Sequence, residues 1–163
     1  METHDKILLA GELLVDAAKT YRAGETNIDF AKSILLAGAV IGIVAPWLEE
    51  LGGKPSQTQL AGMAANLKGV PLTNLPLNEQ QKEIGKSIAF YRLTYNSLKH
   101  AGRGEKTKPS DDRFFEANLK EEAYYLIGNA IDDYNKLPLS RQTINTKLSD
   151  DLLTLLQSHW AAL

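Results

Sequence analysis

The chain has 163 residues and a net charge of −2. This length suits one domain with its own hydrophobic core, and the charge argues against a long basic surface for duplex nucleic acid, though not against a local basic patch. The sequence contains no cysteine, which excludes disulfides, thiolate metal sites and cysteine nucleophiles and is typical of a reducing compartment. We therefore expect a single cytoplasmic domain over residues 1–163.

The first third of the chain predicts two helices, because its apolar residues recur at helical spacing. The first should cover residues 5–23 and end at the glycine that follows. Thr26 or Asn27 can cap the second, which has Asp29 in its first turn, where the helix dipole favours a negative charge. Pro46 lies inside this second helix and should kink or break it.

The second helix is the most apolar part of the chain. Residues 34–48 (ILLAGAVIGIVAPWL) carry no charge, but a helix needs roughly 20 apolar residues to cross a membrane. A helix that is apolar all round and too short to span is typical of the centre of a bundle. Gly38 and Gly42 are one turn apart on it, which favours the close approach of another helix. We therefore expect a central apolar helix over about residues 27–51 and no membrane association.

The rest of the chain predicts four more helices. Ser56 can cap a short helix that ends at about residue 67, and the proline-containing stretch after it should be a loop. Asn78 begins a capping-box spacing and opens a long helix that reaches about residue 101. Asn118 can open a further helix to about residue 137, and Ser149 a last one to about residue 160. The predicted fold class is an all-α bundle of five to six helices.

The sequence does not predict a metal or cofactor site. It lacks a phosphate-binding glycine loop and a His-Glu-x-x-His motif. Neighbouring residues on a helix point about 100° apart, so adjacent carboxylates do not converge on one ion. We therefore interpret three acidic pairs as solvated faces: Asp111-Asp112, Glu121-Glu122 and Asp132-Asp133.

The strongest chemical signal is a set of three polar residues spaced four apart, Arg92, Asn96 and His100. A step of four residues drifts only about 40° round a helix, so the three share one face. A histidine can move a proton near neutral pH, a guanidinium can hold a phosphate, and an amide can orient either group. This pattern is typical of a phosphodiester site. Three nearby cations would add positive potential as binding residues: Lys99, Arg103 and Lys106.

A structural interpretation explains the same residues. Histidine and lysine are favoured at a helix C-terminus because they complement the helix dipole. Asn96 can bond a neighbouring backbone, and Arg92 can pair with a carboxylate of an adjacent helix. On this interpretation the polar stretch stabilises a helix end and does no chemistry.

Residues 95–102 (YNSLKHAG) resemble the Arg-Asn-x-Leu-Lys-His element of HEPN-domain proteins. The flanks agree: residues 31–53 resemble the alanine- and glycine-rich second helix of such domains, and residues 121–137 resemble their closing helix. The resemblance covers roughly residues 29–137. By position, Asn96 and His100 match the family's polar residue and histidine, whereas Tyr95 stands where the family has its arginine, and Arg92 lies one turn earlier.

The resemblance implies a helical bundle that is often a homodimer. In active members, arginine and histidine from two subunits form a metal-independent RNA-cleaving site, and other members only bind ligands or partners. Since Tyr95 replaces the arginine, a non-catalytic module that binds a nucleotide, RNA or a protein partner is our first hypothesis. The alternatives are a metal-independent endoribonuclease of a toxin–antitoxin or phage-defence system, using His100, Arg92 and Asn96, and a purely structural or oligomerisation bundle. Whether the chain is an enzyme stays open at this point.

Overall fold

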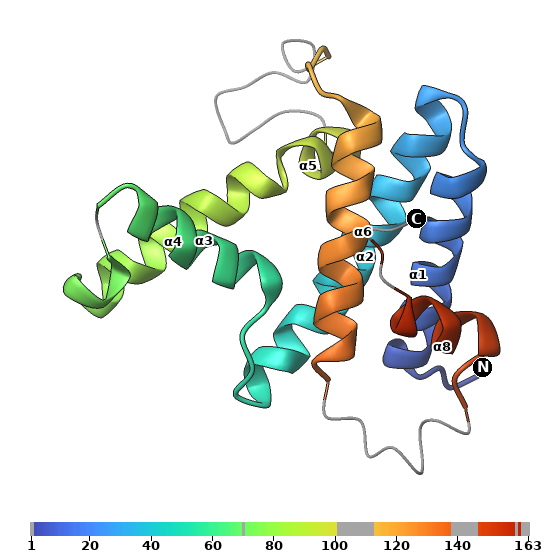
Figure 1. Ribbon diagram of the computed structural model, residues 1–163, viewed down its shortest axis with the longest axis horizontal. Coiled ribbons are helices and arrows are strands. Elements are labelled where there is room, and N and C mark those ends of the chain that lie inside the picture. The colour runs from blue at the N-terminus through green and yellow to red at the C-terminus, as the bar shows by residue number, and fades with distance from the viewer. Residues whose placement is uncertain (1, 70, 101–112, 138–146, 159, 161–163) are drawn as a thin grey trace.

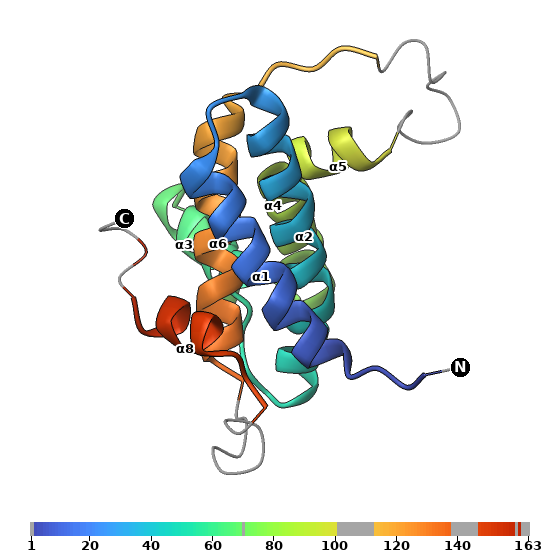
Figure 2. The ribbon, with the colours of Figure 1, turned by 90° about the vertical axis from the view of Figure 1, so that its right-hand side faces the viewer.

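The computed structural model describes residues 2–69, 71–100, 113–137, 147–158 and 160. These residues form an all-α helical bundle without strands, which confirms the predicted fold class. Three long helices stand side by side, α8 packs against two of them, and α3 and α4 project away as an arm (Figures 1 and 2). The helices are α1 (Lys6–Ala23), α2 (Asn27–Glu50), α3 (Ser56–Leu67), the 3-10 turn η1 (Leu72–Asn74), α4 (Leu77–Tyr91), α5 (Leu93–Lys99), α6 (Leu119–Asn135) and α8 (Asp150–Gln157).

The core lies where α2 packs against α1 on one side and α6 on the other. Ile34, Val40 and Val44 of α2 are fully buried, and the Tyr134 hydroxyl of α6 donates a 2.9 Å hydrogen bond to the Ile7 carbonyl just inside α1. The central apolar helix predicted at residues 27–51 is therefore confirmed. By length and composition alone α2 could cross a membrane, but half of its most apolar stretch is buried against its neighbours, and the core helix of a soluble protein passes the same test.

Local capping signals were correct where both partners are close in sequence. Asp29 accepts a hydrogen bond from the Thr26 amide at 3.1 Å, as in a capping box. Asn118 and Ser149 also cap α6 and α8 through their side chains. Two expectations were wrong: α4 begins at Leu77, before Asn78, and Ser56 is the first residue of α3, with its hydroxyl bonded to another helix. Pro46 lies inside α2, which continues to Glu50.

The long helix expected over residues 78–101 is interrupted at Arg92. Its φ of −102° and ψ of 12° leave the helical region, so α4 ends before it and α5 begins after it. The two halves follow different neighbours. The Tyr91 hydroxyl on α4 donates to the Leu60 carbonyl of α3 at 3.3 Å, while the Tyr95 ring on α5 lies against Gly38 of α2. This break corrects the prediction that Arg92 shares one continuous helix with Asn96 and His100.

Gly38 is a position where glycine is required. A β-carbon there would lie 2.2 Å from the Tyr95 ring, so the close helix approach expected at this residue is present. Gly42, one turn on, has nothing within 4 Å of such a carbon and is exposed. The open space beside Gly42 belongs to a pocket that leads to Arg92.

Candidate functional site

The structure separates the three residues singled out in the sequence. Arg92 lies at the junction of α4 and α5, and its side chain reaches α3. His100 is exposed and ends α5, with its backbone amide donating to the Asn96 carbonyl at 3.0 Å. Asn96 is half-buried on α5. No contact joins the side chains of Arg92 and His100 among the described residues.

Of the three expected binding cations, the structure describes Lys99 alone. Lys99 is exposed, and its ammonium lies 5.5 Å from the centre of the Tyr95 ring, a cation–π contact. Arg103 and Lys106 lie outside the described residues, as does the pair Asp111-Asp112. The described part of the chain contains no group of three or more histidine, aspartate or glutamate side chains that could hold a metal ion.

The Arg92 guanidinium is held by Gln57. Its Nε donates a 2.6 Å hydrogen bond to the Gln57 Oε1, and Gln57 is 1% exposed at the start of α3. Burial lowers the pKa of Arg92, opposed by the nearby Tyr95, Asp133 and Glu49. The two terminal nitrogens of the guanidinium have no hydrogen-bond or ion-pair partner within the described ranges. They remain donors for a planar or tetrahedral anion, which a guanidinium binds through two parallel hydrogen bonds.

Arg92 lines a pocket of about 200 Å³ between α2, α3 and α4. Its walls are mostly apolar, from Ile41, Ala45, Pro46, Pro55 and Ile88. Its polar lining comes from Glu49, Gln57, Thr58 and Arg92, and Gly42 leaves the space open on the α2 side. The pocket therefore combines one cation, one carboxylate and neutral hydrogen-bonding groups on an apolar frame, as small-ligand sites do.

Next to Gln57, a polar network joins α3 to α6. Asp133 is fully buried, and its Oδ1 accepts from the Ser56 amide at 2.6 Å and from the Ser56 hydroxyl at 2.5 Å. Lys136 donates to Asp132 at 2.6 Å and to the Ser56 hydroxyl at 3.2 Å. The Ser56 amide is one of the N-terminal donors of α3 that the helix itself cannot satisfy. Asp133 therefore caps α3 from another helix, where the helix dipole favours a negative charge.

The pKa values of the neighbouring carboxylates Asp132 and Asp133 are shifted in opposite directions. Burial raises the pKa of Asp133, although hydrogen bonds from Ser56 and the charge of Lys136 oppose the shift. Burial also acts to raise the pKa of Asp132, but hydrogen bonds from Lys136 and Ser56 outweigh it, so its pKa is lowered. The solvated face expected for this pair is therefore wrong for Asp133, which is buried and bonded.

Two buried side-chain atoms in this region have no hydrogen-bond partner among the described residues: the Gln57 Nε2 and the Asp133 Oδ2. One is a donor and the other an acceptor. Because Gln57 Oε1 accepts from Arg92, the orientation of the Gln57 amide is fixed and its Nε2 must point elsewhere. Groups of this kind are few in folded proteins, where buried polar atoms are usually satisfied by protein or by ordered water.

Sequence reasoning identified Arg92 but missed its partners. Asp133 could have been found, because it continues the buried series of Leu126 and Ala130 on α6 at steps of four and three. Gln57 and Glu49 carried no such signal. They reach the site through the placement of α3 and α2 around α4, which is a tertiary property.

Comparison of the chain with protein-family models, with curated proteins and with solved structures found no match. The HEPN resemblance therefore rests on residues 95–102 and their flanks and stays a prediction. What the Arg92 pocket can bind is a question of its own geometry and charge.

Proposed function

We propose that this chain is a non-catalytic binding module, HEPN-like in its helical organisation, whose Arg92 pocket holds the phosphate of a nucleotide or of RNA. The observation that carries the proposal is the Arg92 guanidinium, which Gln57 holds through Nε, while its two terminal nitrogens have no partner among the described residues and lie at a pocket. Because the guanidinium is already held in place, it loses little side-chain conformational entropy when it binds a phosphate.

The size and charge of the pocket narrow the ligand. About 200 Å³ is below the usual range for a whole small-molecule site, so the pocket holds one group and the rest of the ligand lies over its rim. Glu49 adds a negative charge to the lining and disfavours a bare anion. A nucleotide suits both groups, because its phosphate accepts from Arg92 while amino groups of a base can donate to a carboxylate.

The alternative of a metal-independent endoribonuclease needs Arg92, Asn96 and His100 around one phosphodiester. Arg92 turns toward α3 and His100 is exposed at the far end of α5, which supports binding over catalysis within one chain. A purely structural bundle is the third candidate, and it would leave the pocket unused. The cytoplasmic location expected from the cysteine-free sequence stays a prediction.

Titration of the full-length chain with AMP, GMP and fluorescein-labelled single-stranded RNA tests the proposal. We expect measurable binding of at least one probe, and a loss of about 10- to 100-fold in affinity in Arg92→Gln, the effect of removing a charge-assisted hydrogen bond. Arg113→Gln is the control, because Arg113 is exposed and its side chain lies over the ring of the neighbouring Phe114, away from the lining of the Arg92 pocket.

Equal affinities of the wild type and Arg92→Gln would contradict the proposal. The same RNA, incubated with EDTA and examined on a gel, separates binding from cleavage. Cleavage that disappears in His100→Ala would favour the nuclease, whereas intact RNA with Arg92-dependent binding supports the module proposed here.

A further inference from the structure

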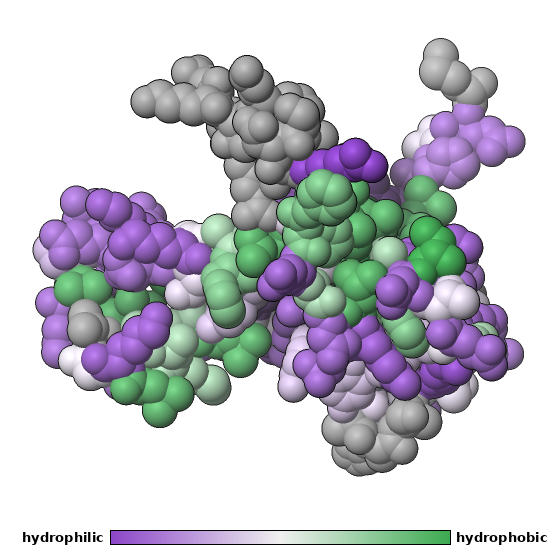
Figure 3. All heavy atoms as spheres, turned by 90° about the horizontal axis from the view of Figure 1, so that it is seen from above, coloured by the Kyte–Doolittle hydropathy of each residue, from purple (hydrophilic) through white to green (hydrophobic). Residues whose placement is uncertain are grey.

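The outward face of α4 is unusual for a helix of a folded domain. No residue of α4 is buried, and its exposed positions Glu79, Glu83, Lys86 and Phe90 follow one another at three- and four-residue steps on one face. Phe90 is 72% exposed, and its ring lies edge-on to that of Tyr91 at 6.0 Å between centroids. In the space-filling view the arm carries hydrophilic and hydrophobic surface side by side (Figure 3).

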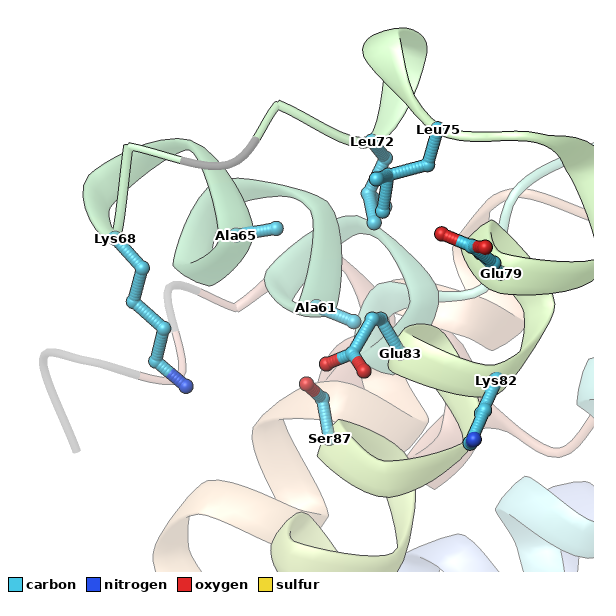
Figure 4. Close-up of a pocket in the computed structure, with 9 residues that line it drawn as sticks. All are labelled: Ala61, Ala65, Lys68, Leu72, Leu75, Glu79, Lys82, Glu83 and Ser87. Carbon is cyan, nitrogen blue, oxygen red and sulfur yellow. The ribbon is translucent and has the colours of Figure 1, made fainter.

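The same arm contains a hollow of about 450 Å³ between α3, η1 and α4. Small side chains, Ala61 and Ala65, leave the space on the α3 side, and Leu72 and Leu75 form its apolar end (Figure 4). Lys68, Lys82, Glu79 and Glu83 add charges of both signs to its lining. The hollow therefore has an apolar end and charged sides, and the exposed Phe90 lies one turn of α4 beyond its lining residue Ser87.

We propose that α4 pairs in antiparallel fashion with α4 of a second copy of this chain, with Phe90 of each copy seated in the hollow of the other. A two-fold interface needs a surface that is complementary to itself. The arm meets this need in shape, because it carries both the projecting side chain and the space that can receive it.

The charges on α4 fix the register of the pair. In each chain Lys86 bonds Glu83 at 2.6 Å. If the two-fold axis crosses α4 between Ile84 and Gly85, Glu83 of each copy faces Lys86 of the other. The same register puts Phe90 opposite Glu79, at the end of the hollow where Leu72 and Leu75 lie (Figure 4). Shape and charge therefore agree on one arrangement.

This inference is independent of the proposed function, because the Arg92 pocket and the α4 face use different residues. The helices α1 and α8 offer less surface for a dimer, because their apolar side chains are largely buried in the core. Two single helices bury less than a standard interface of roughly 1,600 Å², so we expect a weak dimer with a dissociation constant on the order of 10 μM.

Sedimentation velocity of the full-length chain from 5 to 500 μM tests the proposal. We expect reversible dimerisation in the wild type and a loss of at least tenfold in Phe90→Ala. Tyr125→Ala on α6 is the matched control, because Tyr125 is 65% exposed and lies away from the arm. Since Phe90 and Tyr125 are both exposed, both variants should keep the helical circular-dichroism signal of the wild type.

A charge exchange tests the register. Glu83→Lys places lysines opposite lysines across the axis and should weaken the dimer several-fold, whereas the double variant Glu83→Lys with Lys86→Glu restores opposite charges and should recover it. A wild type that is monomeric at 500 μM overturns the proposal. So does a dimer that Phe90→Ala leaves unchanged, or a Glu83→Lys variant that the second substitution fails to rescue.

Discussion

Removal of the Asp133 carboxylate should weaken the attachment of the arm to the core, because Asp133 on α6 binds Ser56 at the start of α3. Asp133→Ala removes the charged acceptor of the Ser56 amide and leaves that amide without its partner while Ser56 is 5% exposed, whereas the Ser56 hydroxyl can still donate to Asp132 at 2.5 Å. Hydrogen bonds to charged groups contribute about 1.5–3 kcal/mol each, and an orphaned buried donor costs about 1–3 kcal/mol. Part of this is recovered, because the buried carboxylate no longer has to be desolvated. We expect a net loss of about 3–5 kcal/mol.

Urea unfolding followed by circular dichroism measures this loss, and Asp132→Ala is the neighbouring control. The Asp132 side chain is 53% exposed and pairs with Lys136, so its removal should cost no more than about 1 kcal/mol. If Asp133→Ala unfolds within 1 kcal/mol of the wild type, or if the two variants lose the same stability, then the capping of α3 by Asp133 does not hold the arm in place.

Two further predictions concern the same framework. Gly38→Ala should lower the free energy of unfolding by about 1–3 kcal/mol, because its β-carbon would lie 2.2 Å from the Tyr95 ring. Gly42→Ala is the control: a β-carbon there has nothing within 4 Å, so this variant should be neutral or stabilise α2 by about 0.5–1 kcal/mol. Similar unfolding midpoints for the two variants would contradict the close packing of α5 on α2. The pKa of Asp133 is raised in the folded chain above its ordinary value of 3.8. Between these two pKa values the folded chain therefore binds more protons at this carboxyl than the unfolded chain does. The contribution of Asp133 to the free energy of unfolding should then fall as the pH rises from 3.8 to the folded pKa. Asp133→Asn removes this contribution, and its stability relative to the wild type, measured by urea unfolding from pH 3.5 to 6, should increase with pH; a difference that stays constant would show that Asp133 does not titrate above its ordinary range.

The features that the sequence predicted correctly depend on neighbours along the chain. The capping pairs at Thr26, Asn118 and Ser149 and the apolar run of α2 are local signals, and each appears as expected. The close approach at Gly38 followed from the small residue itself. These signals defined the helices of the core and their order.

The features that the sequence did not predict depend on which helix packs against which. Periodicity continues smoothly from α4 to α5, yet the chain breaks at Arg92 because Tyr91 bonds α3 and Tyr95 packs on α2. Serine is a common N-cap residue, but here the amide and the hydroxyl of Ser56 both donate hydrogen bonds to Asp133 of α6. Spacing within one helix does not reveal a partner supplied by another.

The break at Arg92 also decides how the candidate site works. A continuous helix would have carried Arg92 along with His100, whereas the break lets Arg92 bond Gln57, the residue after Ser56. Asp133 holds Ser56, so one path of hydrogen bonds runs from α6 through the start of α3 and ends at the guanidinium. The Arg92 pocket lies at the end of this path and is lined by α2 of the core and by both helices of the arm. A ligand bound there contacts core and arm together, and its binding energy therefore stabilises the position of the arm as well as its own contacts.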